Sequence, residues 1–205
     1  MTIIHACVHG FSSGAMLIIA IGAQNVFVLR QGLRREHVFG VVLVCALSDA
    51  ILIQVGVWGL GATALAWPAL ASALRWLGAA FLLLYALRAA ARAWRPGGLD
   101  PGASVPLPSA RGAVLTAAAL TWLNPHVYLD TVLLLGAIAS PYGDAPRAGF
   151  AVGATLASCV WFAALGYGAR WLAPVFAAPQ AWRVLDALIA LTMGLLAVGL
   201  LRSAG

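Results

Sequence analysis

This chain has very little charge for its length. Only 9% of its 205 residues are Asp, Glu, Lys or Arg, whereas 63% are hydrophobic, and its mean hydropathy is +0.96. So few polar side chains cannot cover the surface of a soluble globule, which excludes that class and indicates an integral membrane protein. Lysine is absent and all 12 basic residues are arginine, a bias to which we attach no functional weight.

Catalytic and metal-binding patterns are also lacking. We find no nucleophile elbow, no Walker A or H-E-x-x-H motif and no paired Cys/His cluster. The three cysteines, Cys7, Cys45 and Cys159, lie in separate apolar segments without metal-ligand spacing, so we expect neither a disulfide nor a metal site. The sequence therefore predicts no enzyme, no cofactor and no ATPase. If a chain of this kind moves a solute uphill, the energy has to come from an ion gradient, the membrane potential or another subunit.

Long hydrophobic runs, in contrast, are abundant. Because about 20 residues at roughly 1.5 Å each cross a hydrocarbon core of about 30 Å, the runs predict six transmembrane helices. Their ranges are 6–30, 38–62, 70–91, 111–139, 147–172 and 181–202. We expect the first run to be retained, since no Lys or Arg precedes it and no clear cleavage site follows. A loop rich in Pro, Gly and Ser divides a single transporter domain (1–205) into halves 1–91 and 111–205, with the linker at 92–110.

The two halves resemble each other in two places. The string GAQNVFVL can be aligned with NPHVYLD, and an R-x-L-x-A pattern begins at both Arg75 and Arg183. With three helices in each half the repeat is inverted, and inverted repeats place substrate sites near the midplane, at broken helices. We therefore predict an all-α integral membrane fold of two inverted three-helix repeats, with the site where GAQN and NPH interrupt their segments.

The arginines predict the orientation of these helices. One side of the membrane would hold Arg30, Arg34, Arg35, Arg88, Arg92, Arg95, Arg111, Arg170 and Arg183, and the other only Arg75, Arg147 and Arg202. The positive-inside rule makes the first, arginine-rich side and its linker cytoplasmic. Six spans put both termini outside; a re-entrant or interfacial first segment would move only the N-terminus inside. Because the arginines flank hydrophobic runs, we expect no nucleic-acid partner for the net charge of +6.

An acidic residue lies in the middle of an otherwise uncharged run: Asp49, within residues 38–60. A carboxylate at the midplane costs about 3 kcal/mol on insertion scales, so we expect it only where it faces a bundle interior or has a function. There it could exchange a proton for a cation, which is the chemistry of an antiporter. The alternative is structural, either an ion pair or a neutral carboxyl hydrogen-bonded to a neighbouring helix.

Further polar residues accompany the Asn124-Pro125 step. Asp130 lies four residues after His126, so on a helix the two can pair, and simple neutralisation is the alternative to a functional role. Pro125 lacks an N–H group and would free the carbonyl of Thr121 to line a cavity, while Asn124 adds a donor and an acceptor.

Five other residues have a structural interpretation that competes with a functional role or replaces it. Gln24 and Asn25 could serve the site from the first segment, although interhelical amide contacts are common in membranes. For Asp186 we expect a structural role, because Arg183 and a helix N-terminus lie beside it. Gly149 and Gly153 should allow close helix packing.

Two motifs resemble those of the LysE-type family of bacterial lysine and arginine exporters. They are GFSSGAMLIIAIGAQNVFVLRQGLRREH, followed by SDA in the second segment, and TWLNPHVYLDTVLLLGAIAS. GAQN and NPH are closer to the basic-amino-acid branch than to the homoserine and threonine branch, whose motifs read PGPN and NPK. By position, the family's functional residues fall on Gln24, Asn25, Asp49, Asn124, Pro125 and Asp130, and we add His126.

The resemblance implies export of L-arginine, L-lysine or toxic analogues such as canavanine across the bacterial inner membrane, driven by the proton gradient or the membrane potential. Carboxylates would bind the cationic side chain, bidentately for arginine. An exporter of neutral amino acids or a metal cation is the first alternative. The alternative of another class is a nontransporting membrane scaffold whose polar residues join helices. We also expect the lipid bilayer as a partner, and a homodimer is compatible with the small-residue helix faces.

Overall fold

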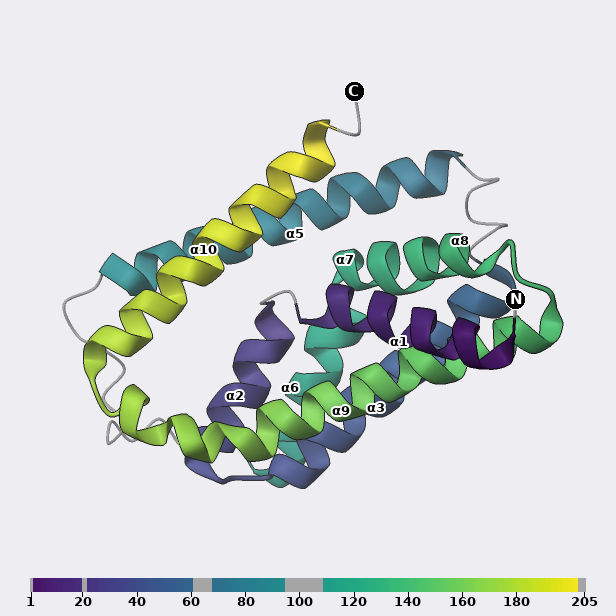
Figure 1. Ribbon diagram of the computed structural model, residues 1–205. Helices are drawn as coiled ribbons and strands as arrows, with labels where there is room; N and C mark the ends of the chain where they lie inside the picture. Colours follow the sequence, from purple (N-terminus) through teal and green to yellow (C-terminus); the bar gives the residue numbers. More distant parts are fainter. Residues whose placement is uncertain (1, 20–21, 61–67, 95–108, 203–205) are drawn as a thin grey trace.

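The computed structural model describes residues 2–19, 22–60, 68–94 and 109–202, and every regular element within them is a helix (Figure 1). This agrees with the predicted all-α class. The elements are α1 (Ile3–Ile18), α2 (Ala23–Arg34), α3 (Val38–Val55), the π-helix η1 (Gly56–Leu60), α5 (Pro68–Trp94), α6 (Ala110–Trp122), α7 (Pro125–Val127), the π-helix η2 (Tyr128–Leu134), α8 (Leu135–Ala139), α9 (Asp144–Phe176) and α10 (Pro179–Arg202). Most of the linker predicted at 92–110 lies outside the described residues.

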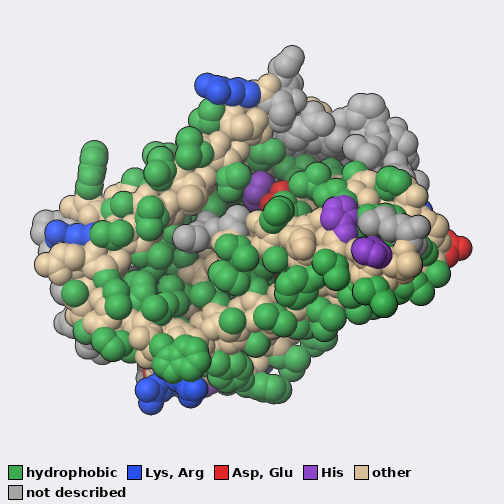
Figure 2. Space-filling model, viewed as in Figure 1, with side chains coloured by type: hydrophobic (Ala, Val, Ile, Leu, Met, Phe, Trp, Pro, Cys, Tyr) green, Lys and Arg blue, Asp and Glu red, His purple; other side chains and the backbone are tan. Residues whose placement is uncertain are grey.

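Several helices are suited to a lipid environment. In the described part of the chain, 4 segments are long and apolar enough to cross a bilayer: Val38–Gly59, Trp76–Trp94, Asp144–Phe176 and Gln180–Arg202. The bent pair α1 and α2 makes 5 if it is counted as one span. Large hydrophobic side chains cover much of the visible outer face (Figure 2), as expected for a surface that contacts acyl chains. The chain is a multi-pass membrane protein.

The first predicted helix, 6–30, is wrong as a single element. The chain forms α1 and α2 instead, and the two helices are bent by 84° relative to each other. Gly22 precedes α2 in an extended conformation, at φ −119° and ψ 177°. Asn25 Nδ2 donates to the carbonyl of Ile18 at 2.8 Å, which satisfies a main-chain acceptor that the end of α1 leaves open. The interruption falls at the GAQN string, where the sequence predicted a broken helix.

The fourth predicted helix, 111–139, is also interrupted. It ends as α6 and restarts at Pro125, and the restarted segment runs through the π-helix η2 into α8. Irregularities of this kind occur frequently at functional sites. One detail of the prediction is wrong: the carbonyl of Thr121 is not free, because it accepts the backbone N–H of Asn124 at 3.3 Å. That bond closes the turn between α6 and α7.

Close contacts through glycine hold α1 against α9, as we expected for Gly149 and Gly153. A Cβ atom at Gly149 would lie only 2.7 Å from the carbonyl oxygen of Ile3, so no larger side chain fits without a shift of the helices. Within α1, residues 10–14 spell G-x-S-x-G, but Ser12 donates its hydroxyl to the carbonyl of Val8 at 2.9 Å. It therefore lies inside a regular helix and not on the strand-to-helix turn of a hydrolase elbow.

The remaining helices bring the two halves of the chain together. Helices α5 and α10 run side by side (Figure 1) and share a buried cluster with Val26 of α2. A second cluster joins α2, α3, α6 and α9 around the buried side chains of Cys45 and Phe162. Between these two clusters lie the interrupted ends of α1, α2, α6 and α7.

Candidate functional site

A cavity lies where the two interrupted segments meet. Its volume is about 80 Å³, room for several water molecules at roughly 10–15 Å³ each. All the predicted site residues line it except Pro125, whose side chain lies outside the described part. The polar lining residues are Gln24, Asn25, Asp49, Asn124, His126, Asp130 and Thr131, and the apolar ones include Phe81, Leu82, Phe162, Met193 and Leu196. Both halves of the chain contribute side chains.

Asp49 enters this cavity from the middle of α3. Its side chain is buried, with 5% of the residue exposed, and the hydroxyl of Ser158 on α9 donates to Asp49 Oδ2 at 2.8 Å. None of the ion pairs found among the described residues involves Asp49. Of the two forms of the structural alternative, the ion pair is not found among the described residues, whereas the hydrogen bond to a neighbouring helix is present. A carboxylate has about four lone-pair positions, so Asp49 can still accept a cation or a proton from the cavity.

Ser158 is a partner that the sequence did not reveal to us. It is fully buried at 0% exposure, 109 residues away from Asp49 along the chain. The one available signal was a hydroxyl in the long apolar run that forms α9. Such hydroxyls usually bond to their own helix backbone, so the signal is weak.

The start of α2 contributes two amides that behave differently. Both polar groups of the Asn25 side chain form hydrogen bonds at the break between α1 and α2. Its Nδ2 donates to the carbonyl of Ile18, and its Oδ1 accepts the indole N–H of Trp161 at 3.2 Å. The Nε2 group of Gln24, in contrast, is buried without a hydrogen-bond partner. A buried donor with no acceptor is unfavourable by about 1–3 kcal/mol. Asn25 therefore has a clear structural role, whereas Gln24 offers a donor to the cavity.

The start of α7 organises the second interruption. Asn124 Oδ1 accepts the backbone N–H of His126 at 3.1 Å, which caps the restarted helix. His126 Nε2 lies 3.0 Å from Asp130 Oδ2, so the pair predicted from the four-residue spacing is confirmed as a contact. About 26% of the Asp130 side chain is exposed, compared with 15% for His126. His126 Nδ1 is a second buried cavity atom that lacks a hydrogen-bond partner.

The balance of charge in the cavity favours a cationic ligand. Asp49 and Asp130 are both acidic, and among the described lining residues His126 is the only titratable base. No arginine is found among the lining residues that the structure describes, which leave out the side chain of Arg75. Two carboxyl groups with at most one cation between them would attract positive charge, and the surrounding apolar walls strengthen that attraction.

Comparison with known proteins identifies the family of this chain. The family model described as LysE type translocator matches residues 15–204. A Mycobacterium bovis protein and two Mycobacterium tuberculosis proteins from different strains are each 52% identical over 177 residues, covering 86% of this chain and 87% of each relative. All three are provisionally named amino-acid transporters. No solved structure matches the chain. Since the family model covers almost the entire sequence, this chain belongs to the LysE type translocator family and is a translocator, not an enzyme.

Proposed function

We propose that this protein exports basic L-amino acids, namely arginine, lysine and analogues such as canavanine, from the cytoplasm. The observation that carries the proposal is the presence of Asp49 and Asp130 in one cavity, with no arginine among the lining residues that the structure describes. The relatives, named for amino-acid transport, support the general substrate class. A cationic side chain is the complement that two carboxyl groups select, and a guanidinium can bind a carboxylate through two parallel hydrogen bonds.

The α-carboxylate of the substrate needs a separate donor. The Nε2 group of Gln24 is buried and unpartnered at the start of α2, where the helix dipole favours negative charge. A substrate held at both ends would span the cavity from the Gln24 amide to the carboxyl groups. This arrangement explains why a donor is kept unsatisfied in an apolar protein.

Replacing Gln24 with leucine should reduce arginine transport about 10-fold or more, mainly through a higher KM, because one hydrogen bond to a charged group contributes about 1.5–3 kcal/mol. Agmatine, which is arginine without its α-carboxylate, should be transported equally by the variant and the wild type. Transport of both compounds is measured in proteoliposomes. The matched control is Gln54→Leu, since Gln54 is exposed on α3 and does not line the cavity. An equal loss for both compounds would show that Gln24 does not bind the carboxylate.

The proposed mechanism uses alternating access. Two inverted three-helix repeats, in the bacterial inner membrane with the arginine-rich side facing the cytoplasm, would rock around the cavity. Asp49 and Asp130 would bind the cation from the inside, and protonation from the outside would release it. The proton gradient or the membrane potential supplies the energy.

The proposal is tested by efflux from cells that lack their own exporters. Radiolabelled arginine and lysine are loaded as dipeptides, with leucine and threonine dipeptides as neutral comparisons and an empty vector as control. We expect vector-level efflux of the neutral amino acids and faster efflux of both basic ones. Efflux of the neutral amino acids alone would show that the substrates are neutral and not basic. No efflux from a well-inserted protein would favour the scaffold alternative. Metal cargo is disfavoured because no group of three His, Cys, Asp or Glu side chains suited to a metal occurs among the described residues.

A further inference from the structure

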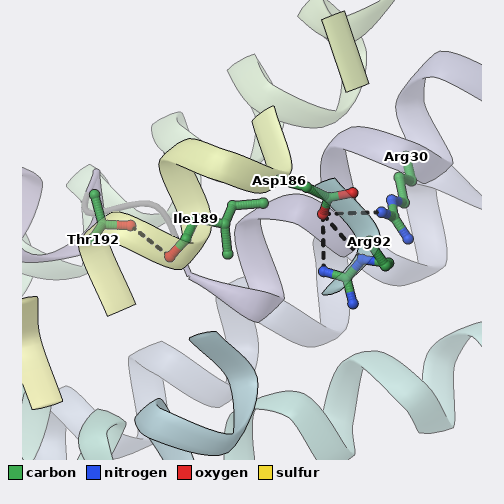
Figure 3. Close-up of polar contacts among 5 residues, drawn as sticks. All are labelled: Arg30, Arg92, Asp186, Ile189 and Thr192. Carbon is green, nitrogen blue, oxygen red and sulfur yellow. Dashed lines mark hydrogen bonds and ion pairs between the residues drawn. The ribbon is translucent and has the colours of Figure 1, made fainter. Parts of the chain in front are cut away.

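An ionic cluster around a buried carboxylate lies outside the cavity and joins three helices (Figure 3). The side chains of its two arginines, Arg30 and Arg92, are each 30% exposed. Asp186 of α10 accepts hydrogen bonds from Arg92 Nε at 3.0 Å and Nη2 at 2.9 Å, and Arg30 Nη2 lies 3.8 Å from the same Oδ1 atom. Only 4% of Asp186 is exposed. The local role that we expected beside Arg183 was too narrow, because Arg92 lies 94 residues away along the chain.

The cluster is displaced from the cavity in the same direction on all three helices. On α2, Arg30 follows Gln24 by about 9 Å along the axis; on α10, Asp186 precedes the lining residue Met193 by about 10 Å. On α5, Arg92 follows the lining residue Leu82 by about 15 Å. Each displacement leads toward the helix end that carries the arginine-rich side. The cluster therefore lies between the cavity and the helix ends that the arginine count assigns to that side.

Aromatic rings surround the two guanidinium groups. Arg30 lies over the Trp182 ring at 5.5 Å, and Arg92 lies over the Tyr85 ring at 5.9 Å. The Nε and Nη2 atoms of Arg30 are buried without hydrogen-bond partners. The carboxylate and its two cations thus form a packed layer across α2, α5 and α10. None of these residues is among those that line the cavity.

Charged groups are an unusual choice for a layer that only has to be stable. Well-packed hydrophobic residues often stabilise such a position as well as a buried ion pair does, or better. Charged groups have a different advantage, because water can hydrate each of them once they separate. An ionic contact can therefore stay open to water, whereas separated apolar side chains would close again. A contact of this type suits an element that alternates between two arrangements.

We propose that the Arg92–Asp186 pair, supported by Arg30, is the gate that closes the cavity on the arginine-rich side. The pair joins α5 of the first half to α10 of the second half, so movement of one half relative to the other would break it. The structure holds this gate closed. The proposal rests on the proposed export function for the direction of substrate flow, but the gate itself can be tested without transport.

The test measures access of water-soluble reagent to the cavity. Thr131, which lines the cavity, is replaced by cysteine in a background with alanine at Cys7, Cys45 and Cys159. A charged, membrane-impermeant maleimide is then added to inside-out or right-side-out vesicles. Adding Arg92→Ala or Asp186→Asn should raise the labelling rate from the arginine-rich side about 10-fold and leave the opposite side unchanged. Arg88→Ala, at an exposed position on the same helix, should not change it.

The exchanged pair, Arg92→Asp with Asp186→Arg, should restore slow labelling. If a single variant fails to insert, the labelling rate of the exchanged pair tests the gate in its place. Unchanged labelling in the inserted single variants, or rapid labelling of the exchanged pair, would overturn the gate. Because the readout is labelling and not efflux, a protein that fails to export arginine or lysine can still pass this test. The two proposals therefore fail separately.

Discussion

Replacing Asp49 with asparagine should lower arginine and lysine export about 100-fold or more while the protein still inserts and folds. Asparagine has nearly the same shape, and its Oδ1 atom can accept the hydroxyl of Ser158 as the carboxylate Oδ2 does at 2.8 Å. What the variant loses is the negative charge that binds the cation and the proton. Removing one member of a buried charge pair costs roughly 2–5 kcal/mol, which corresponds to a loss of this size.

Two matched variants separate the charge from its surroundings. Ser158→Ala removes the hydrogen bond but keeps the carboxylate, so export should fall only a few-fold. Asp144→Asn changes an exposed acid outside the cavity and should leave export unaltered. Efflux, the amount of protein in the membrane and its melting temperature in detergent are measured together. Normal export by Asp49→Asn would reduce the carboxylate to a structural role, and loss of assembly would favour the scaffold alternative.

Replacing Asp130 with asparagine should have the second largest effect, a fall in export of about 10- to 100-fold. Asp130 is more exposed to the cavity than its partner His126, so it can meet an entering substrate. It is also paired at 3.0 Å, so part of its charge is already compensated when the histidine is protonated. For this reason we expect a smaller loss than at Asp49.

His126→Gln is the informative comparison for Asp130. Glutamine can still donate a hydrogen bond, but it cannot carry a positive charge, so the carboxylate stays available to the substrate. Export by this variant should fall less than export by Asp130→Asn, and the KM for arginine should not rise. If His126 only neutralises Asp130, both variants should lower the melting temperature alike. In that case Asp130→Asn, like His126→Gln, should leave the KM for arginine unchanged. Initial rates in proteoliposomes distinguish the two results.

Much of the candidate site was accessible from the sequence because polar groups are rare in it. In a chain that is 63% hydrophobic, an Asp in an apolar run or an Asn-Pro step stands out, and bilayer energetics make each one a site candidate. The structure brings Gln24, Asn25, Asp49, Asn124 and the His126–Asp130 pair around one cavity. Their roles in transport stay predictions. For Asn25 the observed bonds favour the structural alternative, which the sequence had left open.

Other features had no local signal. The GAQN string predicted the position of the break between α1 and α2 but not its angle of 84°, because hydropathy registers only a continuous apolar run from 6 to 30 and the contact of Asn25 with Ile18 crosses the break. The carbonyl of Thr121 was assigned to the cavity on the rule for proline, but a turn bond to Asn124 uses it. Ser158 and Asp186 look ordinary in the sequence because their partners are 109 and 94 residues away.

The sequence by itself determined that this is a helical membrane protein, where its helices would break and which rare polar residues would be exceptional in lipid. These follow from solvation, which acts on each segment separately and can be read one residue at a time. Only the tertiary structure decided which of those residues share a cavity, that Asp49 has Ser158 for a partner and that Asp186 joins α2, α5 and α10. Those pairings depend on how the helices pack. Packing is set by helix surfaces that are far apart in the sequence, so no single segment determines it.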